Sequence, residues 1–351
     1  GHDALAAVAV GRLDDEPAQL RHRRGASRFR HRPWTRDRPH ASKALRRVRG
    51  LSAPATDGAT GRSARLVGVI GHEPRACDDG ARQRPERIGD TEVSYRDAAS
   101  ILTRATGFMS DYDFTLNPYS GCGFGCSYCY AAFFSRDPQR SDSWGRWVEV
   151  KQNALERLDR RRTSLTGKAI YMSSVTDPYQ PIERRLLLVR GLLEALAEQQ
   201  PRLVVQTRSP LVTRDIDVLR RFEHVRVNMT VTTDSDAVRK GFEPMCPGNR
   251  ARLAAIATVA ASGIETCVTM TPLLPVERPE QFARDLLDTG VRRFVVQPFH
   301  LDRGRFVAGT REAALTLIRE LSWTPERYRA TVDILRQHLP VLIEGREGFA
   351  P

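Results

Sequence analysis

The sequence lacks the features of a membrane protein or a disulfide-stabilised protein. Its 351 residues include no apolar run long enough to span a bilayer. No basic segment precedes the first apolar residues and no cleavage site is evident after them, so we expect no signal peptide. The six cysteines, three of them within one short loop, do not form the spaced set of a disulfide framework. We therefore predict a cytoplasmic protein with no membrane partner.

Aromatic residues are scarce, at 7%, and positive charge is unevenly distributed. The formal net charge is +13, and residues 1–90 hold 19 Lys and Arg against 11 Asp and Glu. Apart from a candidate strand at 64–70, this segment has little hydrophobic periodicity and too few apolar residues to offset its ordering entropy. We predict a poorly ordered extension over 1–90. A nucleic-acid-binding arm is the alternative, which we favour less because Phe29 and Trp34 are too few for a stacking surface.

From Val93 onward, buried strands alternate with amphipathic helices. The predicted strands cover 113–117, 169–175, 203–207, 225–232, 265–271 and 293–298. The predicted helices cover 152–161, 184–199, 215–222, 249–262 and 279–289, and Asn249 and Gly263 would begin and end the fourth. Six such units predict an α/β fold, a partial (β/α)6 TIM-like barrel over 91–305, with its active site at the carboxyl ends of the strands. A C-terminal helical region over 306–351 would pack on the barrel.

The segment NPYSGCGFGCSYCY at 117–130 places Cys122, Cys126 and Cys129 in one tight loop. In a reducing compartment, three thiolates at this spacing indicate a metal or a cluster. Interleaved glycines let the backbone curl around a bulky inorganic core by adopting positive φ angles: Gly121, Gly123 and Gly125. Three protein ligands leave one iron of a [4Fe–4S] cubane open for a non-protein ligand, as the amino and carboxylate groups of S-adenosylmethionine would be.

A structural zinc ion is the alternative for this loop. Such a site needs four ligands and usually draws them as two close pairs. The next cysteine, Cys246, lies far along the chain, and no histidine is near the loop. The spacing therefore favours a cluster.

With Tyr128 before the third cysteine, the loop resembles that of the radical S-adenosylmethionine enzymes. Other segments narrow the resemblance to the spore photoproduct lyase-like branch, often labelled DNA repair photolyases. They are SVTDPYQP at 174–181, TRSP at 207–210, RDID at 214–217, EP at 243–244 and RL at 252–253. The resemblance extends from about residue 93 to 300 and does not cover the N-terminal quarter.

This resemblance implies roles at the cofactor site for several residues. Tyr128 would lie against the adenine region, Thr176, Asp177 and Thr230 would be near or in contact with S-adenosylmethionine, Arg208 would meet its carboxylate, and Val268 and Met270 would border the adenine. Arginine at 208 keeps the charge of the lysine often found there and adds a bidentate fork. For Val268 and Met270 the alternative is ordinary barrel packing, and for Asp177 it is capping of a turn.

One departure concerns the hydrogen-atom donor of the lyase. In that enzyme a cysteine stands three residues before the aspartate, and here the position is Ser174, whose O–H bond is much stronger than a thiol S–H bond. Cys246, in a loop at the predicted barrel mouth, is a weak substitute candidate. We assign no role to Cys77 or Cys267, and we interpret His300, after the sixth strand, as a structural histidine.

The sequence thus predicts a radical enzyme that binds a [4Fe–4S] cluster and S-adenosylmethionine. It would generate a 5′-deoxyadenosyl radical for hydrogen abstraction, on nucleic acid if it acts as the lyase-like branch does. A reductant such as a flavodoxin or ferredoxin would supply the electron. Two alternatives are a radical enzyme acting on a small molecule or peptide, which Ser174 favours, and a non-enzymatic iron–sulfur redox sensor that binds nucleic acid through the basic extension.

Overall fold

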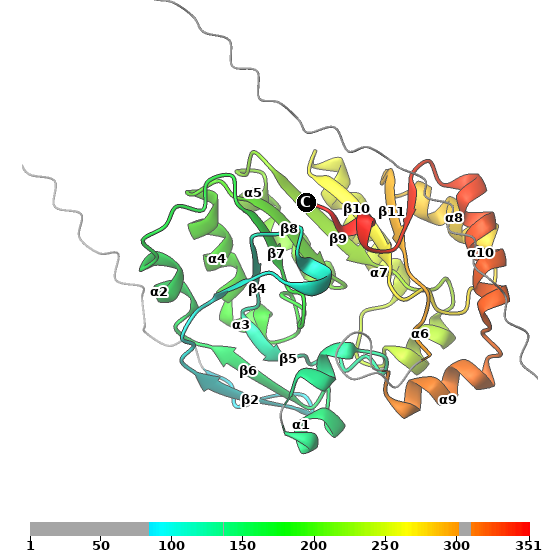
Figure 1. The fold of residues 1–351 in the computed structure, drawn as a ribbon, viewed down its shortest axis with the longest axis horizontal. Coiled ribbons are helices and arrows are strands. Elements are labelled where there is room, and N and C mark those ends of the chain that lie inside the picture. The colour runs from blue at the N-terminus through cyan, green and yellow to red at the C-terminus, as the bar shows by residue number, and fades with distance from the viewer. Residues whose placement is uncertain (1–83, 136, 302–309) are drawn as a thin grey trace, which may run out of the picture. The chain divides into compact units, whose positions relative to one another are not determined.

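The computed structural model describes residues 84–135, 137–301 and 310–351 (Figure 1). The predicted extension over 1–90 and the candidate strand at 64–70 lie outside the described residues, except for 84–90. In that last stretch, strand β1 (Arg87–Ile88) begins the described fold. Within the described ranges, no helix is long and apolar enough to cross a membrane.

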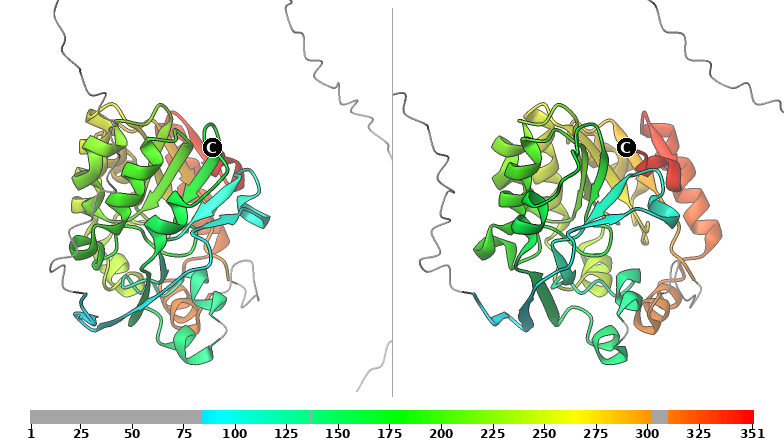
Figure 2. Two further views of the ribbon diagram at one scale, coloured as in Figure 1. Left: turned by 90° about the vertical axis from the view of Figure 1, so that its left-hand side faces the viewer. Right: turned by 60° about the vertical axis from the view of Figure 1, so that its left-hand side comes forward.

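A large, mostly parallel sheet forms the centre of the fold (Figures 1 and 2). Every pairing in it is parallel except that of β3 with β4. Its strands are, in spatial order, β12 (Leu342–Glu344), β11 (Arg293–Val296), β10 (Glu265–Met270), β9 (Val225–Thr230), β8 (Arg202–Thr207), β7 (Ala169–Met172), β4 (Phe114–Leu116) and β3 (Leu102–Arg104). All six predicted strands are present, as β4 and β7 to β11. The predicted partial α/β barrel is confirmed.

Two strands extend this sheet beyond the prediction. Strand β3 adds an antiparallel edge beside β4, and β12 adds a parallel edge beside β11. The second lies in the region over 306–351 that was predicted to be helical. Both are only three residues long, so neither has a period-2 pattern long enough to stand out in the sequence.

Helices follow most strands of the barrel (Figure 1). Helix α4 illustrates the packing, because its buried side chains repeat at intervals of three and four residues and face the sheet. The α-helices are α1 (Pro138–Asp142), α2 (Ala154–Asp159), α3 (Glu183–Leu186), α4 (Leu188–Ala197), α5 (Ile216–Leu219), α6 (Asp236–Phe242), α7 (Asn249–Ala261), α8 (Pro279–Leu287), α9 (Glu312–Glu320) and α10 (Pro325–His338). The 3-10 helices are η1 (Gly107–Met109), η2 (Tyr130–Phe134), η3 (Pro210–Asp215) and η4 (Arg346–Phe349).

Two details of the predicted helices are wrong. The helix predicted over 184–199 is divided into α3 and α4 because Leu187 adopts a left-handed conformation with φ 53°. Helix α7 is capped by Gly248 rather than by Asn249, whose side-chain amide instead donates to the Thr233 carbonyl at 2.7 Å. Gly263, with φ 84°, follows the helix as predicted.

A second, four-stranded sheet supports the cysteine loop and was not predicted. Its order is β1, β2 (Thr91–Arg96), β6 (Trp147–Lys151) and β5 (Tyr119–Gly121). Only two residues separate β4 from β5, so the chain passes from the barrel directly into this small sheet and then reaches Cys122. Strand β5 is hidden in the sequence because it is short and overlaps the glycine-rich cysteine motif.

Candidate active site

The glycines of the cysteine loop have distinct roles in its geometry. Gly121 has φ 76°, and a Cβ there would lie 2.5 Å from the Trp147 carbonyl oxygen. Gly125 has φ 59° and packs closely on the backbone of Gly145. These two positions therefore require glycine. The prediction of a positive φ at Gly123 is wrong, since its backbone is not left-handed and a Cβ would make only ordinary contacts.

The three thiols of the loop line one cavity of about 810 Å³. Cys122 and Cys126 are buried, and Cys129 is half-buried. Five of the residues predicted at the cofactor site line the same cavity: Tyr128, Thr176, Asp177, Arg208 and Thr230. They come from the cysteine loop and from the carboxyl ends of β7, β8 and β9. The structure thus brings most of the predicted site together.

Most of the remaining candidates lie outside the wall of this cavity. Val268 and Met270 are fully buried in β10, and neither lines the cavity in the described part of the chain. Cys246 is buried behind the cysteine loop, with its sulfur 3.6 Å from that of Cys126. Cys267 is fully buried in β10. His300 is exposed and lines the cavity, at the predicted end of the barrel.

Asp177 joins the ends of two neighbouring strands. Its Oδ1 accepts from the backbone N–H of Tyr179 at 2.9 Å and from the hydroxyl of Thr207 at 2.7 Å. Its Oδ2 accepts from the backbone N–H of Arg208 at 2.9 Å. Burial raises the pKa of this carboxyl group, against the effect of the three donors. Asp177 therefore caps a turn and also fixes the backbone that carries Arg208.

Thr176 and Gln180 attach the cysteine loop to the end of β7. The Thr176 hydroxyl donates to the Gly121 carbonyl at 2.7 Å and accepts from the Gln180 side chain at 3.2 Å. The other end of that side chain, Oε1, accepts from the backbone N–H of Gly123 at 2.8 Å. These bonds hold the loop against the barrel and give the TDPYQ segment a structural role that the sequence did not predict.

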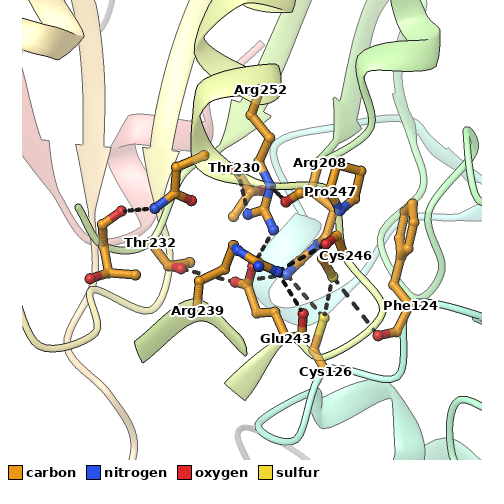
Figure 3. A network of polar contacts seen from close by, with 12 residues as sticks. Phe124, Cys126, Arg208, Thr230, Thr232, Arg239, Glu243, Cys246, Pro247 and Arg252 are labelled. Atoms are coloured by element: carbon orange, nitrogen blue, oxygen red, sulfur yellow. Dashed lines mark hydrogen bonds and ion pairs between the residues drawn. The ribbon is translucent and has the colours of Figure 1, made fainter. Parts of the chain in front are cut away.

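Arg208 contacts the cysteine loop through a single nitrogen (Figure 3). Its Nη1 lies 3.0 Å from the Cys126 sulfur, 2.8 Å from the Tyr128 hydroxyl oxygen and 3.1 Å from Glu243 Oε1. The guanidinium thus reaches a thiol and a carboxylate at once, and its side chain stays 17% exposed in the cavity wall.

Glu243 is the centre of this network, and its role was not predicted. It is fully buried, and Arg252, also fully buried, donates to its Oε2 at 2.5 Å. Burial raises the pKa of the Glu243 carboxyl group, but Arg252 and Arg208 outweigh burial and hold the pKa at about 2. The dipeptide at 243–244 marked the family resemblance, yet no spacing in the sequence reveals that these arginines converge on it.

The three cysteine thiols differ in electrostatic environment. The pKa of Cys126 is lowered by its contact with the Cys246 thiol and by the Arg208 guanidinium, against the effect of burial. Burial raises the pKa of Cys122, and burial followed by the nearby Cys126 raises the pKa of Cys129 to about 11. Of these three thiols, Cys126 is therefore the one whose surroundings favour the thiolate.

Another part of the cavity lining contains polar side chains joined to one another. Gln206 donates from Nε2 to the hydroxyls of Thr230 at 2.7 Å and Thr269 at 2.9 Å. The Tyr130 hydroxyl donates to the Ser174 carbonyl oxygen, across the mouth of the loop. Next to it, Ser173 has φ 74° and a buried hydroxyl without a partner among the described residues. Strain of this kind at a cavity wall is typical of functional sites.

Three comparisons with known proteins agree with this fold. Residues 116–288 match the family model of the Radical SAM superfamily. An uncharacterized protein of Methanocaldococcus jannaschii is 35% identical over 162 residues, which are 46% of this chain and 61% of that protein. An uncharacterized protein of Mycobacterium tuberculosis is 28% identical over 304 residues, covering 76% and 87% of the two chains.

Among solved structures, a spore photoproduct lyase variant with bound AdoMet and dinucleoside spore photoproduct has a similar fold. The TM-score is 0.50 at 16% identity, over 72% of this chain and 81% of that chain. Residues 116–288 therefore form a Radical SAM superfamily domain, and the fold is similar to that of the spore photoproduct lyase. The predicted resemblance to the radical SAM family is confirmed. The chain spans about 61% of the length of the archaeal relative.

Proposed function

We propose that Cys122, Cys126 and Cys129 hold a [4Fe–4S] cluster and that the adjoining cavity binds S-adenosylmethionine. The observation that carries this proposal is that all three thiols line the same cavity as five predicted cofactor residues. The donor set fits, because cubane clusters are held by thiolates and three ligands leave one iron open. Cys246, the nearest further thiol, lies behind the loop and does not line the cavity.

Arg208 is the residue that we propose for the carboxylate of S-adenosylmethionine. Its three recorded bonds all use Nη1, while the side chain is partly exposed in the cavity wall. Nε and Nη2 can therefore serve a carboxylate as a planar fork. Thr176, Asp177 and Thr230 are proposed to shape the rest of the pocket, with Tyr128 beside the adenine. Met270, which is buried and does not line the cavity, would contribute by packing against the lining residues.

When both are bound, the [4Fe–4S] cluster and S-adenosylmethionine would supply the chemistry. It is the reductive cleavage of S-adenosylmethionine to methionine and a 5′-deoxyadenosyl radical, which abstracts a hydrogen atom from the substrate. The residues of the chain orient the cofactor and keep water from the reacting atoms. A one-electron donor of the flavodoxin or ferredoxin type is proposed as the partner.

A nucleic-acid substrate is supported by the rim of the cavity. Phe108, Tyr130 and Phe134 line the cavity and are 44%, 40% and 49% exposed, and Arg104 and Lys151 line it too. Exposed rings beside cations are suited to stacking on bases and pairing with phosphates. The spore photoproduct lyase of similar fold was solved with a dinucleoside lesion bound.

A second candidate is a radical enzyme for a small molecule or a peptide. Ser174 favours it, because this side chain lines the cavity where the lyase has its hydrogen-donating cysteine. Binding of a DNA oligonucleotide by the full chain and by a variant without residues 1–83, which keeps β1, separates these cases. No binding by either protein would favour the small molecule or peptide. Equal affinity of both proteins would indicate the cavity rim, whereas loss on deletion would favour a basic arm, as in the redox-sensor alternative.

The cluster itself is tested by anaerobic reconstitution with iron and sulfide. We expect about four iron and four sulfide per chain, and loss of the cluster in single Cys122→Ala, Cys126→Ala and Cys129→Ala variants. Cys267→Ala, at a buried cysteine outside the cavity, is the matched control and should keep the cluster. Uptake of zinc in place of iron would overturn the proposal.

A further inference from the structure

Glu243 is the most highly connected buried carboxylate of the candidate site. Its Oε1 accepts from the hydroxyls of Tyr128 and Thr232 and from Arg208 Nη1, and its Oε2 accepts from Arg252 Nη2. None of its surface is exposed. These four donors satisfy both oxygens, so the carboxylate has a single orientation.

The donors come from four separate parts of the chain. Tyr128 belongs to the cysteine loop, Arg208 follows β8, Thr232 follows β9 and Arg252 lies in α7. Figure 3 shows the arginines surrounding the segment that contains Glu243. Arg239 adds a further tie, because its Nη1 donates to the backbone carbonyls of Glu243 and Cys246. The position of Glu243 is thus fixed by the barrel itself.

Within the part of the chain that the structure describes, Glu243 is the carboxylate bonded to the Arg208 side chain, whereas Asp177 bonds the Arg208 backbone. Of the contacts recorded for its side chain, the charge-bearing partner is Glu243, and the others are the Tyr128 hydroxyl and the Cys126 sulfur. A guanidinium on a flexible stem that lines a cavity will otherwise turn toward water. An ion pair to a fully buried carboxylate opposes that motion. It also fixes the plane of the guanidinium, and with it the direction of the remaining N–H groups.

We infer that Glu243 is a positioning residue that holds Arg208 ready for the carboxylate of S-adenosylmethionine. This inference rests on the proposed function, in which Arg208 receives that carboxylate. Glu243 itself does not line the cavity. Its contribution is to reduce the number of side-chain conformations that Arg208 loses when S-adenosylmethionine binds, which is a preorganisation effect.

The test compares two probes on the reconstituted protein by equilibrium dialysis. S-adenosylhomocysteine carries the carboxylate and is unreactive, whereas methylthioadenosine shares its adenosine and thioether but has no carboxylate. In a Glu243→Gln variant we expect S-adenosylhomocysteine to bind about 10-fold more weakly, the equivalent of one charge-assisted hydrogen bond. Methylthioadenosine should bind within about 2-fold of the wild type, because it never contacts Arg208.

A double-mutant cycle distinguishes positioning from general destabilisation. If Glu243 acts through Arg208, the Arg208→Ala variant and the Arg208→Ala/Glu243→Gln variant should bind S-adenosylhomocysteine equally. Asp215→Asn is the matched control, since Asp215 is also fully buried and paired with two arginines, Arg190 and Arg214, away from the cavity. It should leave the affinities for both probes unchanged.

Glu243→Gln leaves Arg252 without its buried partner and can therefore fail to fold. A Glu243→Gln/Arg252→Met variant removes both charges and is the second form of the same test. Equal weakening of both probes, or no weakening of S-adenosylhomocysteine while Arg208→Ala weakens it, would overturn the inference alone. Failure of the wild-type protein to bind S-adenosylhomocysteine would overturn the proposed function beneath it.

Discussion

Two buried glutamates, Glu243 at the candidate site and Glu183 in helix α3, have the same burial but opposite electrostatic character. Both are fully shielded from water, and each accepts from a tyrosine hydroxyl. Glu183 has one arginine partner, Arg214 at 2.7 Å, whereas Glu243 has two. Burial raises the pKa of Glu183, while at Glu243 the two guanidiniums outweigh burial and lower the pKa to about 2.

The two carboxyl groups differ in the number of cations beside them and not in burial, and the pKa is lowered where two guanidiniums meet the carboxylate. At the candidate site the carboxylate also brings Arg208 to the sulfur of Cys126. The network around Glu183 joins α3 to β5 and η3, through Tyr119 and Arg214. The first network therefore lies at the proposed cofactor site, and the second joins elements of the fold.

The largest effect is expected from removing the carboxylate of Glu243. A Glu243→Ala variant leaves two buried or half-buried guanidiniums without their anion, so we expect it to lose about 3–5 kcal/mol of unfolding free energy. Urea denaturation measures this loss. A cost below about 1 kcal/mol would show that the arginines find other partners, and the contrast with Glu183 would disappear.

The pH dependence sharpens the same contrast. Because the folded pKa of Glu243 is lowered from 4.5 to about 2, its stabilisation is fully present above 4.5 and is lost as the pH falls toward 2. The shift corresponds to about 3 kcal/mol. The cost of Glu243→Gln, measured by urea denaturation across pH, should therefore shrink from neutral pH toward pH 2. A constant cost would contradict the lowered pKa.

Glu183→Gln should show the opposite trend with a smaller size. Its raised pKa means that the folded state binds the proton more tightly, so the wild-type protein gains stability as the pH falls through the folded pKa, and fully below 4.5. We expect a cost of about 1–2 kcal/mol at neutral pH that grows on acidification. The same urea denaturation series measures this cost. A cost that shrinks as the pH is lowered would make the two networks alike.

The smallest effect is expected at Asp236, the solvent-exposed partner of Arg239. Asp236 pairs with Arg239 at 2.9 Å but is 64% exposed. An Asp236→Asn variant should therefore lose less than about 1 kcal/mol, with little change in cluster content. Thermal denaturation and iron analysis check this, and a loss near that of Glu243→Ala would mean that exposure does not separate these charges.

The barrel could be predicted because its strands repeat one pattern. Strands such as β7, buried along its whole length, alternate with helices whose apolar residues recur at three and four positions. The cysteine loop could be predicted because its ligands are adjacent in the chain. The small sheet could not, since β1 and β5 are two and three residues long and gain their structure from pairing with β2 and β6.

The Glu243 network was beyond the sequence for a different reason. Its members are far apart in the chain, and a glutamate beside a proline looks the same in the sequence whether it is exposed or buried. Only the convergence of the cysteine loop, β8, β9 and α7 reveals four donors around one carboxylate. The break at Leu187 was likewise hidden, because leucine is an ordinary helix residue and nothing in the sequence marks its φ of 53°.

The most direct test of the account is anaerobic reconstitution and chemical reduction of the protein, followed by an assay for 5′-deoxyadenosine formed from S-adenosylmethionine. We predict that the wild-type protein forms 5′-deoxyadenosine and methionine and that Cys126→Ala forms neither. A wild-type protein that assembles the cluster and binds S-adenosylmethionine, yet never cleaves it, would contradict the account.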